Sequence, residues 1–349
     1  MTDDVLISID GPTGRLSLNR PKAIHALNTG MCRAMLAALV DWRSDPAVRL
    51  VMIDHAAGRG FCAGGDIRAL WESGGGDGAI ARDFFRIEYQ LNHLLFTYAK
   101  PVMAFMDGIT MGGGVGISQP AKYRIATERT VYAMPETGIG LFPDVGAGWY
   151  LSRLPGRTGP WLAVTGARID GADCLALGLA THYVPSGALS QLKADLVARP
   201  GDIEGVLAAA SATPPESKIA GWRADIDRLF ASDRYEDILA ALEADGGEWA
   251  AAQRATLATK SPQACKVSLR ELAESLRLTD FADEMRMEYG IGTKVVQRHD
   301  FLEGVRALIV DKDNQPRWEP ATPEAVTDHL IDTIFAPLDP AEAWEPYRG

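Results

Sequence analysis

Residues 101–148, PVMAFMDGITMGGGVGISQPAKYRIATERTVYAMPETGIGLFPDVGAG, decide how the whole sequence is interpreted. The apolar run Val102–Met106 predicts a buried strand, and a glycine cluster follows it at residues 112–116. Two carboxylates, Glu136 and Asp144, then stand in turn-rich surroundings. The pattern fits an active site in which backbone N–H groups bind an oxyanion while the carboxylates handle protons or a water. It fits equally a strand, a turn and a helix start beside ordinary surface acids.

The segment before this stretch repeats the same architecture. Residues 49–54 (RLVMID) predict a buried strand, and residues 58–70 (GRGFCAGGDIRAL) predict a glycine-rich turn followed by a helix. Neither glycine cluster matches G-x-G-x-x-G or contains G-K-[ST], so a loop for nucleotide phosphates is poorly supported. Two such turns can instead aim two backbone N–H groups at one oxygen, because glycine lets a ligand approach the backbone closely.

Glu88 stands out among the residues between these two segments. Phe84, Leu91 and Leu95 recur at helical spacing, and Glu88 shares their apolar face. A carboxylate on such a face is either partnered and structural or faces a cleft.

The remainder of the chain changes character at about residue 186. Short strands are expected at residues 5–9, 15–18, 122–126 and 181–184, and helical spacing dominates beyond them. Prolines and glycines at residues 199–217 predict a linker, and Phe301, Val305 and Ile309 form a stripe typical of a packing face. We therefore divide the chain into a core of residues 1–200 and a helical C-terminal region of residues 201–349.

Composition restricts the class of protein. The 349 residues are 47% hydrophobic and 23% charged, which is typical of a globular protein of one large or two ordinary domains. The net charge of −11 argues against a nucleic-acid partner, and no apolar run approaches the roughly 20 residues that span a membrane. The acidic N-terminal residues show no targeting signal, and four scattered cysteines without CxxC suggest a cytoplasmic location. Six scattered histidines predict no metal site.

Long motifs across nearly the whole chain then match a known family. The segments GRGFCAGGDI, DGITMGGGVGIS, MPETGIGLFPDVGAG and HDFLEGVRALIVDKDNQPRWEP carry the likeness. The sequence resembles the crotonase (enoyl-CoA hydratase/isomerase) superfamily and, within it, the 3-hydroxyisobutyryl-CoA hydrolase branch. The resemblance implies an α/β fold, a crotonase-type spiral of ββα units followed by a helical C-terminal region. It also implies a short acyl-CoA substrate, with coenzyme A as part of the substrate and no separate cofactor.

The resemblance also implies a set of site residues. The two N–H groups that bind the thioester oxygen match Gly65 and Gly113. Three acids, Glu88, Glu136 and Asp144, match positions around the acyl part of the substrate. Backbone at Ala26, Ala63, Asp66 and Ile67 matches segments that lie against coenzyme A. Hydratases of the family carry a second glutamate at the position of Gly116, so hydration is disfavoured here.

The expected activity is hydrolysis of a short 3-hydroxyacyl-CoA thioester, 3-hydroxyisobutyryl-CoA first, as in valine degradation. Glu136 would act either as a nucleophile or as a general base, with Asp144 positioning the 3-hydroxyl or the water and Glu88 in support. The alternatives are an enoyl-CoA isomerase, which needs only one base, and a non-catalytic or RNA-binding member of the fold. A homo-oligomer is possible because family cores often assemble.

Overall fold

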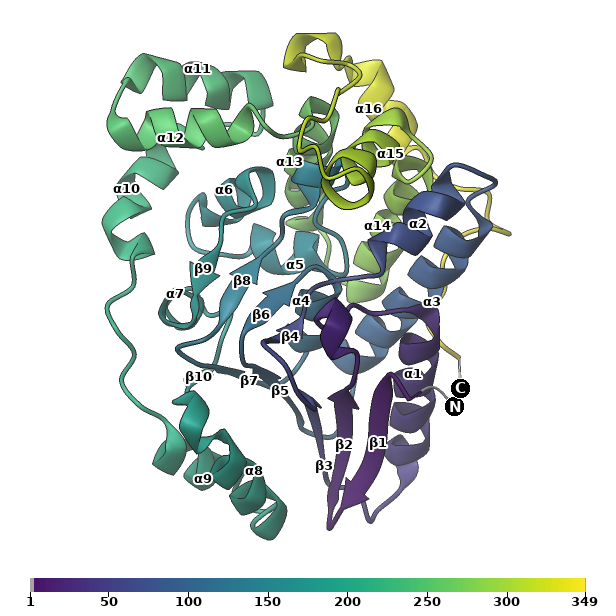
Figure 1. Cartoon of the computed structure of the whole chain (residues 1–349), viewed down its shortest axis with the longest axis vertical. Helices are drawn as coiled ribbons and strands as arrows, with labels where there is room; N and C mark the ends of the chain where they lie inside the picture. Colours follow the sequence, from purple (N-terminus) through teal and green to yellow (C-terminus); the bar gives the residue numbers. More distant parts are fainter. Residues whose placement is uncertain (1–2, 349) are drawn as a thin grey trace.

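Each successive unit of the spiral contributes one strand to each of two sheets. The structure is a computed structural model and describes residues 3–348 (Figure 1). One sheet has the order β1-β2-β3-β5-β7-β10 and the other has the order β4-β6-β8-β9. The strands of the first are β1 (Val5–Asp10), β2 (Thr13–Leu18), β3 (Leu50–His55), β5 (Val102–Met106), β7 (Tyr123–Ala126) and β10 (His182–Tyr183). Those of the second are β4 (Gly60–Cys62), β6 (Ile109–Met111), β8 (Val131–Ala133) and β9 (Ile169–Asp170).

The pairing of these strands produces a spiral. β3, β5 and β7 pair in parallel in the large sheet, while β4, β6 and β8 pair in parallel in the small one. Only the terminal pairs β1–β2 and β8–β9 are antiparallel among the described strands. Each unit therefore advances one position in both sheets, and the expected spiral of ββα units is confirmed.

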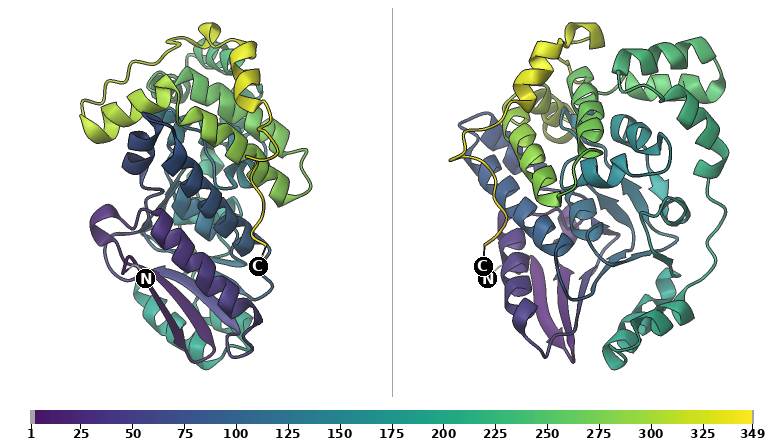
Figure 2. Two further views of the ribbon diagram at one scale, coloured as in Figure 1. Left: turned by 90° about the vertical axis from the view of Figure 1, so that its right-hand side faces the viewer. Right: turned by 180° about the vertical axis from the view of Figure 1, so that it is seen from behind.

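The helices surround the two sheets (Figures 1 and 2). Those of the spiral are α1 (Thr29–Ser44), α2 (Ile67–Gly74), α3 (Ala79–Phe96), α4 (Gly113–Ser118), α5 (Ala147–Ser152), α6 (Thr158–Thr165) and α7 (Gly171–Ala176). Those that follow are α8 (Leu189–Ala198), α9 (Ile203–Ala210), α10 (Ile219–Leu229), α11 (Tyr235–Asp245), α12 (Glu248–Leu257), α13 (Pro262–Ser275), α14 (Phe281–Val295), α15 (His299–Val305) and α16 (Asp328–Phe335). No helix within residues 3–348 is long and apolar enough to cross a membrane.

The central strands are buried on both faces, which explains their continuous apolar sequences. On β3, Val51 and Ile53 join the main core, whereas Leu50 and Met52 join a second cluster with residues of α8 and α9. The expected linker at residues 199–217 is therefore wrong in part. Its middle forms α9, whose apolar residues pack on the sheet, whereas residues 199–202 and 211–217 on either side lack helix and strand.

The later helices pack on the spiral rather than apart from it. α13 contacts α5 and α6, α14 contacts α3, and all contribute to one hydrophobic core. α13 begins directly after Ser261, whose hydroxyl accepts a hydrogen bond from the Ala264 N–H at 3.0 Å. Figure 2 shows α8 and α9 at one end of the long axis and the C-terminal helices at the other. The division of the chain at residue 200 stays a prediction.

Candidate active site

Three turns meet at one edge of the small sheet. Because β4, β6 and β8 run parallel, the residues that follow them lie together: Gly65, Gly113 and Glu136. The backbones approach closely, since a Cβ on Gly64 would lie 3.5 Å from the carbonyl oxygen of Met111 and 3.8 Å from the Gly113 nitrogen. Gly64 also has φ of +118°, a conformation that favours glycine.

Within the described residues, the hydrogen bonds of the secondary structure do not use the backbone N–H groups of Gly65 and Gly113. Leu27 forms a parallel bridge there, but it donates to the Gly64 carbonyl at 2.7 Å and accepts from the Asp66 N–H at 2.8 Å. The N–H of Gly65 takes no part in that bridge. Gly113 begins α4, and the first N–H groups of a helix have no partner within it. Both glycines line the same cavity, so both N–H groups can serve a bound oxygen.

The cavity has a volume of about 290 Å³, and its lining is largely apolar apart from three acids and Arg168. Three acids from different elements line it: Glu88 from α3, Glu136 after β8 and Asp144 from the loop before α5. All three are buried, with exposed fractions of 2%, 6% and 5%. The remaining lining includes Ala63, Ile67, Leu70, Phe84, Phe85, Pro135, Ile139, Leu141, Val145, Arg168, Leu308 and Ile309.

The structure decides between the two interpretations of Glu88. Its side chain faces the cavity, and its Oε1 has no hydrogen-bond partner among the described residues. That oxygen lies 2.5 Å from the position that a Cβ on Gly113 would take, so any side chain at 113 would displace the carboxyl group. Burial raises the pKa of Glu88 well above its ordinary value, and the charges of Asp144 and Glu136 raise it further.

Glu136 and Asp144 differ in their surroundings. Burial raises the pKa of Glu136 well above its ordinary value, with a further contribution from the charge of Asp144, and Glu136 Oε2 has no partner among the described residues. Asp144 accepts a hydrogen bond from the Tyr89 hydroxyl at 2.7 Å. Burial raises the pKa of Asp144 to about 6, and the bond from Tyr89 opposes that rise. Of the three acids, Asp144 therefore ionises most readily.

Gly116, the position that lacks the carboxylate of family hydratases, is tightly enclosed. A Cβ there would lie 2.6 Å from the Cβ of Val145 and 2.9 Å from Nδ2 of Asn92. Val145 has φ of +58° and is buried beside Gly116 of α4. The space that a glutamate would need is filled by this loop.

Only two of the four residues expected to lie against coenzyme A line the cavity. Ala63 and Ile67 line the cavity, whereas Ala26 and Asp66 do not. Arg20 joins the latter two, because it donates to the Ala26 carbonyl at 2.5 Å and to the Asp66 carboxylate at 3.1 Å. Their contact with coenzyme A stays a prediction.

Sequence reasoning missed several residues of the site. The role of Tyr89 could not be recognised, because an aromatic side chain in an apolar helix is typical of a core residue. Ile309 was expected in a packing face, but it is 40% exposed and lines the cavity with Leu308. Phe301 and Val305 stay in the core, but Ile309 lies in a π-helical turn at residues 306–310, which breaks the helical spacing; such turns are common at functional sites. Arg168 gave no sequence signal.

Comparison with known proteins places this fold and site. The sequence profile of the enoyl-CoA hydratase/isomerase family matches residues 13–335, so the chain belongs to that family. A 3-hydroxyisobutyryl-CoA hydrolase of Xenopus laevis is 43% identical, covering 95% of this chain and 89% of its own. The crystal structure of a carnitinyl-CoA dehydratase from Mycobacterium thermoresistibile is 41% identical with a TM-score of 0.93, covering 97% of this chain and 98% of its own. That of an enoyl-CoA hydratase from Rhodobacter sphaeroides is 40% identical with a TM-score of 0.92, covering 98% and 100%.

These comparisons confirm the crotonase-type fold and correct one expectation. The Xenopus laevis relative is named as a mitochondrial protein, which contradicts the cytoplasmic location expected from the sequence. Scattered cysteines and the absence of a recognisable signal are compatible with either reducing compartment, so composition could not distinguish them.

Gly116→Ala tests the close packing beneath Asp144. We expect the free energy of unfolding to fall by about 1–3 kcal/mol, because the new Cβ must displace Val145 or Asn92. Urea denaturation measures this change. The matched control is Gly221→Ala on α10, where no atom of residues 3–348 beyond its chain neighbours and its own helix backbone lies within 4 Å of the new Cβ, and a gain of ~0.5–1 kcal/mol is expected. Equal behaviour of the two variants would contradict the packing argument.

Proposed function

We propose that this protein hydrolyses the thioester of 3-hydroxyisobutyryl-CoA or a closely related short 3-hydroxyacyl-CoA. The observation that carries the proposal is that two backbone N–H groups without a hydrogen-bond acceptor in residues 3–348 and three buried carboxyl groups meet at one small cavity. The relative from Xenopus laevis that carries this activity in its name supports the choice of substrate.

The two glycines would serve the carbonyl oxygen. Attack on a thioester carbonyl places negative charge on that oxygen, and the N–H groups of Gly65 and Gly113 would bind it. A preorganised donor of this kind is typically worth about 3 kcal/mol in activation free energy. Both backbones are held by strands of the small sheet, so the donors need no reorganisation during the reaction.

Glu136 would be the acting carboxylate. It either attacks the carbonyl carbon, giving a mixed anhydride that water opens, or removes a proton from water that attacks directly. Its raised pKa makes it a stronger base than an exposed glutamate. Asp144, held by Tyr89, would bind the 3-hydroxyl or orient the water, and Glu88 would support the acyl end as an acid.

Coenzyme A would enter as part of the substrate and leave as the free thiol. The proposed steps use carboxyl groups, water and backbone N–H groups, so the chemistry requires no metal or redox cofactor. The backbone near Ala26, Ala63, Asp66 and Ile67 would lie against the coenzyme, and Arg168 at the cavity provides a cation for its anionic part.

Hydration or isomerisation of an enoyl-CoA is the rival, because the two similar crystal structures are of a dehydratase and a hydratase. The enclosed glycine at 116 argues against the hydratase arrangement. A thiol-release assay over short acyl-CoA esters, with product identification, separates these activities. We expect free coenzyme A from 3-hydroxyisobutyryl-CoA, and a shifted or hydrated double bond without thiol release would refute the proposal.

Glu136→Gln should abolish thioester hydrolysis while the fold survives. The amide can neither attack the carbonyl nor accept a proton from water, and we expect kcat to fall by at least ~10²-fold. Thiol release measures the rate, and circular dichroism checks the fold. Glu248→Gln, at an exposed position of α12, should keep normal turnover. Near-normal turnover of Glu136→Gln would exclude Glu136 as the catalyst.

Asp144→Asn should shift the acidic limb of the pH profile. The active form of Glu136 is ionised, so kcat/KM falls as the pH drops through its pKa. The charge of Asp144 contributes to the raised pKa of Glu136, so its removal lowers that pKa and moves the limb to lower pH. Profiles of kcat/KM between pH 4.5 and 8 measure the shift, with the exposed Asp237→Asn as control. An unmoved limb would show that the two groups are not coupled.

A further inference from the structure

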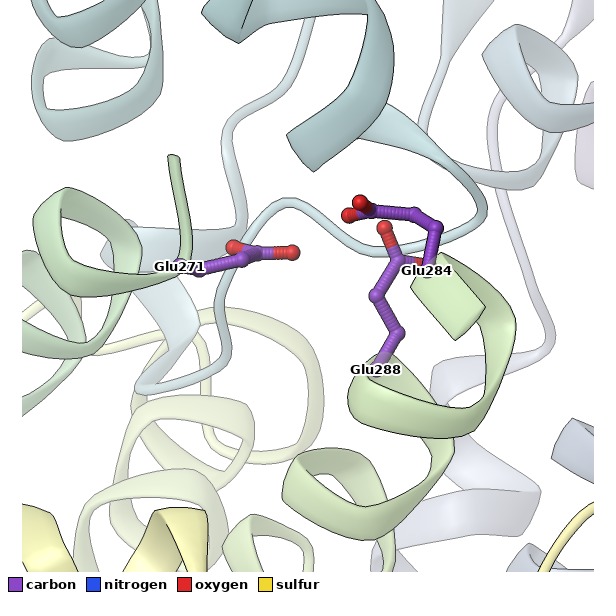
Figure 3. A group of neighbouring side chains, drawn as sticks. All are labelled: Glu271, Glu284 and Glu288. Carbon is purple, nitrogen blue, oxygen red and sulfur yellow. The ribbon is translucent and has the colours of Figure 1, made fainter. Parts of the chain in front are cut away.

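Two C-terminal helices bring together three glutamates that do not line the acyl-CoA cavity (Figure 3). Glu284 and Glu288 lie on consecutive turns of α14, and Glu271 comes from α13. All three have an exposed fraction of 0%, and one carboxylate oxygen from each lies within 4.8 Å of the others. Charged side chains are almost never buried so completely without a partner.

Fixed hydrogen-bond donors hold two of these carboxyl groups in place. The Gly146 N–H donates to Glu288 Oε2 at 2.7 Å, and the Ser275 hydroxyl donates to Glu284 Oε1 at 2.7 Å. Each bond orients one oxygen and leaves the other, Glu288 Oε1 and Glu284 Oε2, without a partner among the described residues. Ligating carboxylates in metal sites are supported by outer hydrogen bonds in this same manner.

Glu271 provides a separate observation. Both of its oxygens lack a hydrogen-bond partner among the described residues, and Figure 3 shows its side chain pointing across from α13 toward the other two. An ionised carboxylate has only acceptor atoms, so a third carboxylate cannot satisfy the first two. Such a group needs a cation or shared protons to remain buried.

We propose that Glu271, Glu284 and Glu288 form a binding site for one divalent, oxygen-preferring cation, with Ca²⁺ as the ion of best fit. Three carboxylates offer six oxygens, the lower end of the six to eight that Ca²⁺ takes. Oxygens on opposite sides of Ca²⁺ lie ~4.6–5.2 Å apart, which is compatible with oxygens that all lie within 4.8 Å of one another. Mg²⁺ usually keeps several bound waters and is held by one or two carboxylates, unlike this set of three buried carboxylates. The divalent charge offsets two of the three negative charges.

The site touches the loop that carries Asp144. Glu288 holds the Gly146 N–H, two residues after Asp144, and Val145 between them has a left-handed backbone. A bound cation keeps Glu288 ionised and fixed, and the loop with it. The ion therefore has a structural role next to the acyl-CoA cavity, and it takes no part in the proposed hydrolysis.

Calcium binding by the full-length protein tests the site. After treatment with a chelator and dialysis, calorimetric titration with Ca²⁺ should show one ion per chain. Saturating Ca²⁺ should raise Tm by at least ~3 °C. Glu271→Gln and Glu284→Gln should each abolish both effects. Glu274→Gln, at a partly exposed position of α13, should retain both Ca²⁺ binding and the rise in Tm. It thereby controls for ions held loosely by the acidic surface.

The metal-free proteins distinguish the cation from shared protons. In both cases Glu271→Gln removes a buried acid and should raise Tm without metal, but only a cation site gives a Ca²⁺-dependent rise that the substitution eliminates. Absence of a stoichiometric ion at 1 mM Ca²⁺, or equal binding by wild type and Glu271→Gln, would overturn the proposal. Binding of Mg²⁺ or Mn²⁺ but not Ca²⁺ would overturn the choice of ion. If Glu271→Gln does not fold, Glu284→Gln decides. These readouts are independent of thioester hydrolysis.

Discussion

The close approach of two glycine turns is the constraint on which the site depends. β4 and β6 are adjacent parallel strands, so the turns after them stack, and a Cβ on Gly112 would lie 3.3 Å from the Cα of Gly64. The Glu88 carboxyl group uses the space that a side chain at Gly113 would need. Only glycine lets two backbone N–H groups and a buried acid share this edge of the sheet.

Three acids in one cavity acquire different properties from their surroundings. Asp144 receives a hydrogen bond from Tyr89, while Glu136 and Glu88 each keep an unpartnered oxygen. Burial raises the pKa of all three acids. The rise is smallest for Asp144, because the hydrogen bond from Tyr89 favours its charged form. Environments that separate pKa values in this way allow one site to hold an acid and a base together.

The C-terminal region contributes residues to the site. Leu308 and Ile309 close one side of the cavity, and Glu288 on α14 holds the N–H of Gly146 in the loop that carries Asp144. The same loop fills the space beside Gly116. The geometry around the acyl end is therefore decided jointly by segments from both halves of the chain.

The sequence by itself determined the strand–glycine turn–helix units, the apolar face that carries Glu88 and, through long motifs, the family. These are local patterns, because periodicity and turn residues act within about one element. It did not reveal α9 as part of the fold, the rotation of Ile309, the Tyr89–Asp144 bond or the meeting of Glu271 with Glu284 and Glu288. Those depend on contacts between distant segments. Only the tertiary structure decided them, because packing sets which side chains meet, and local spacing carries no record of it.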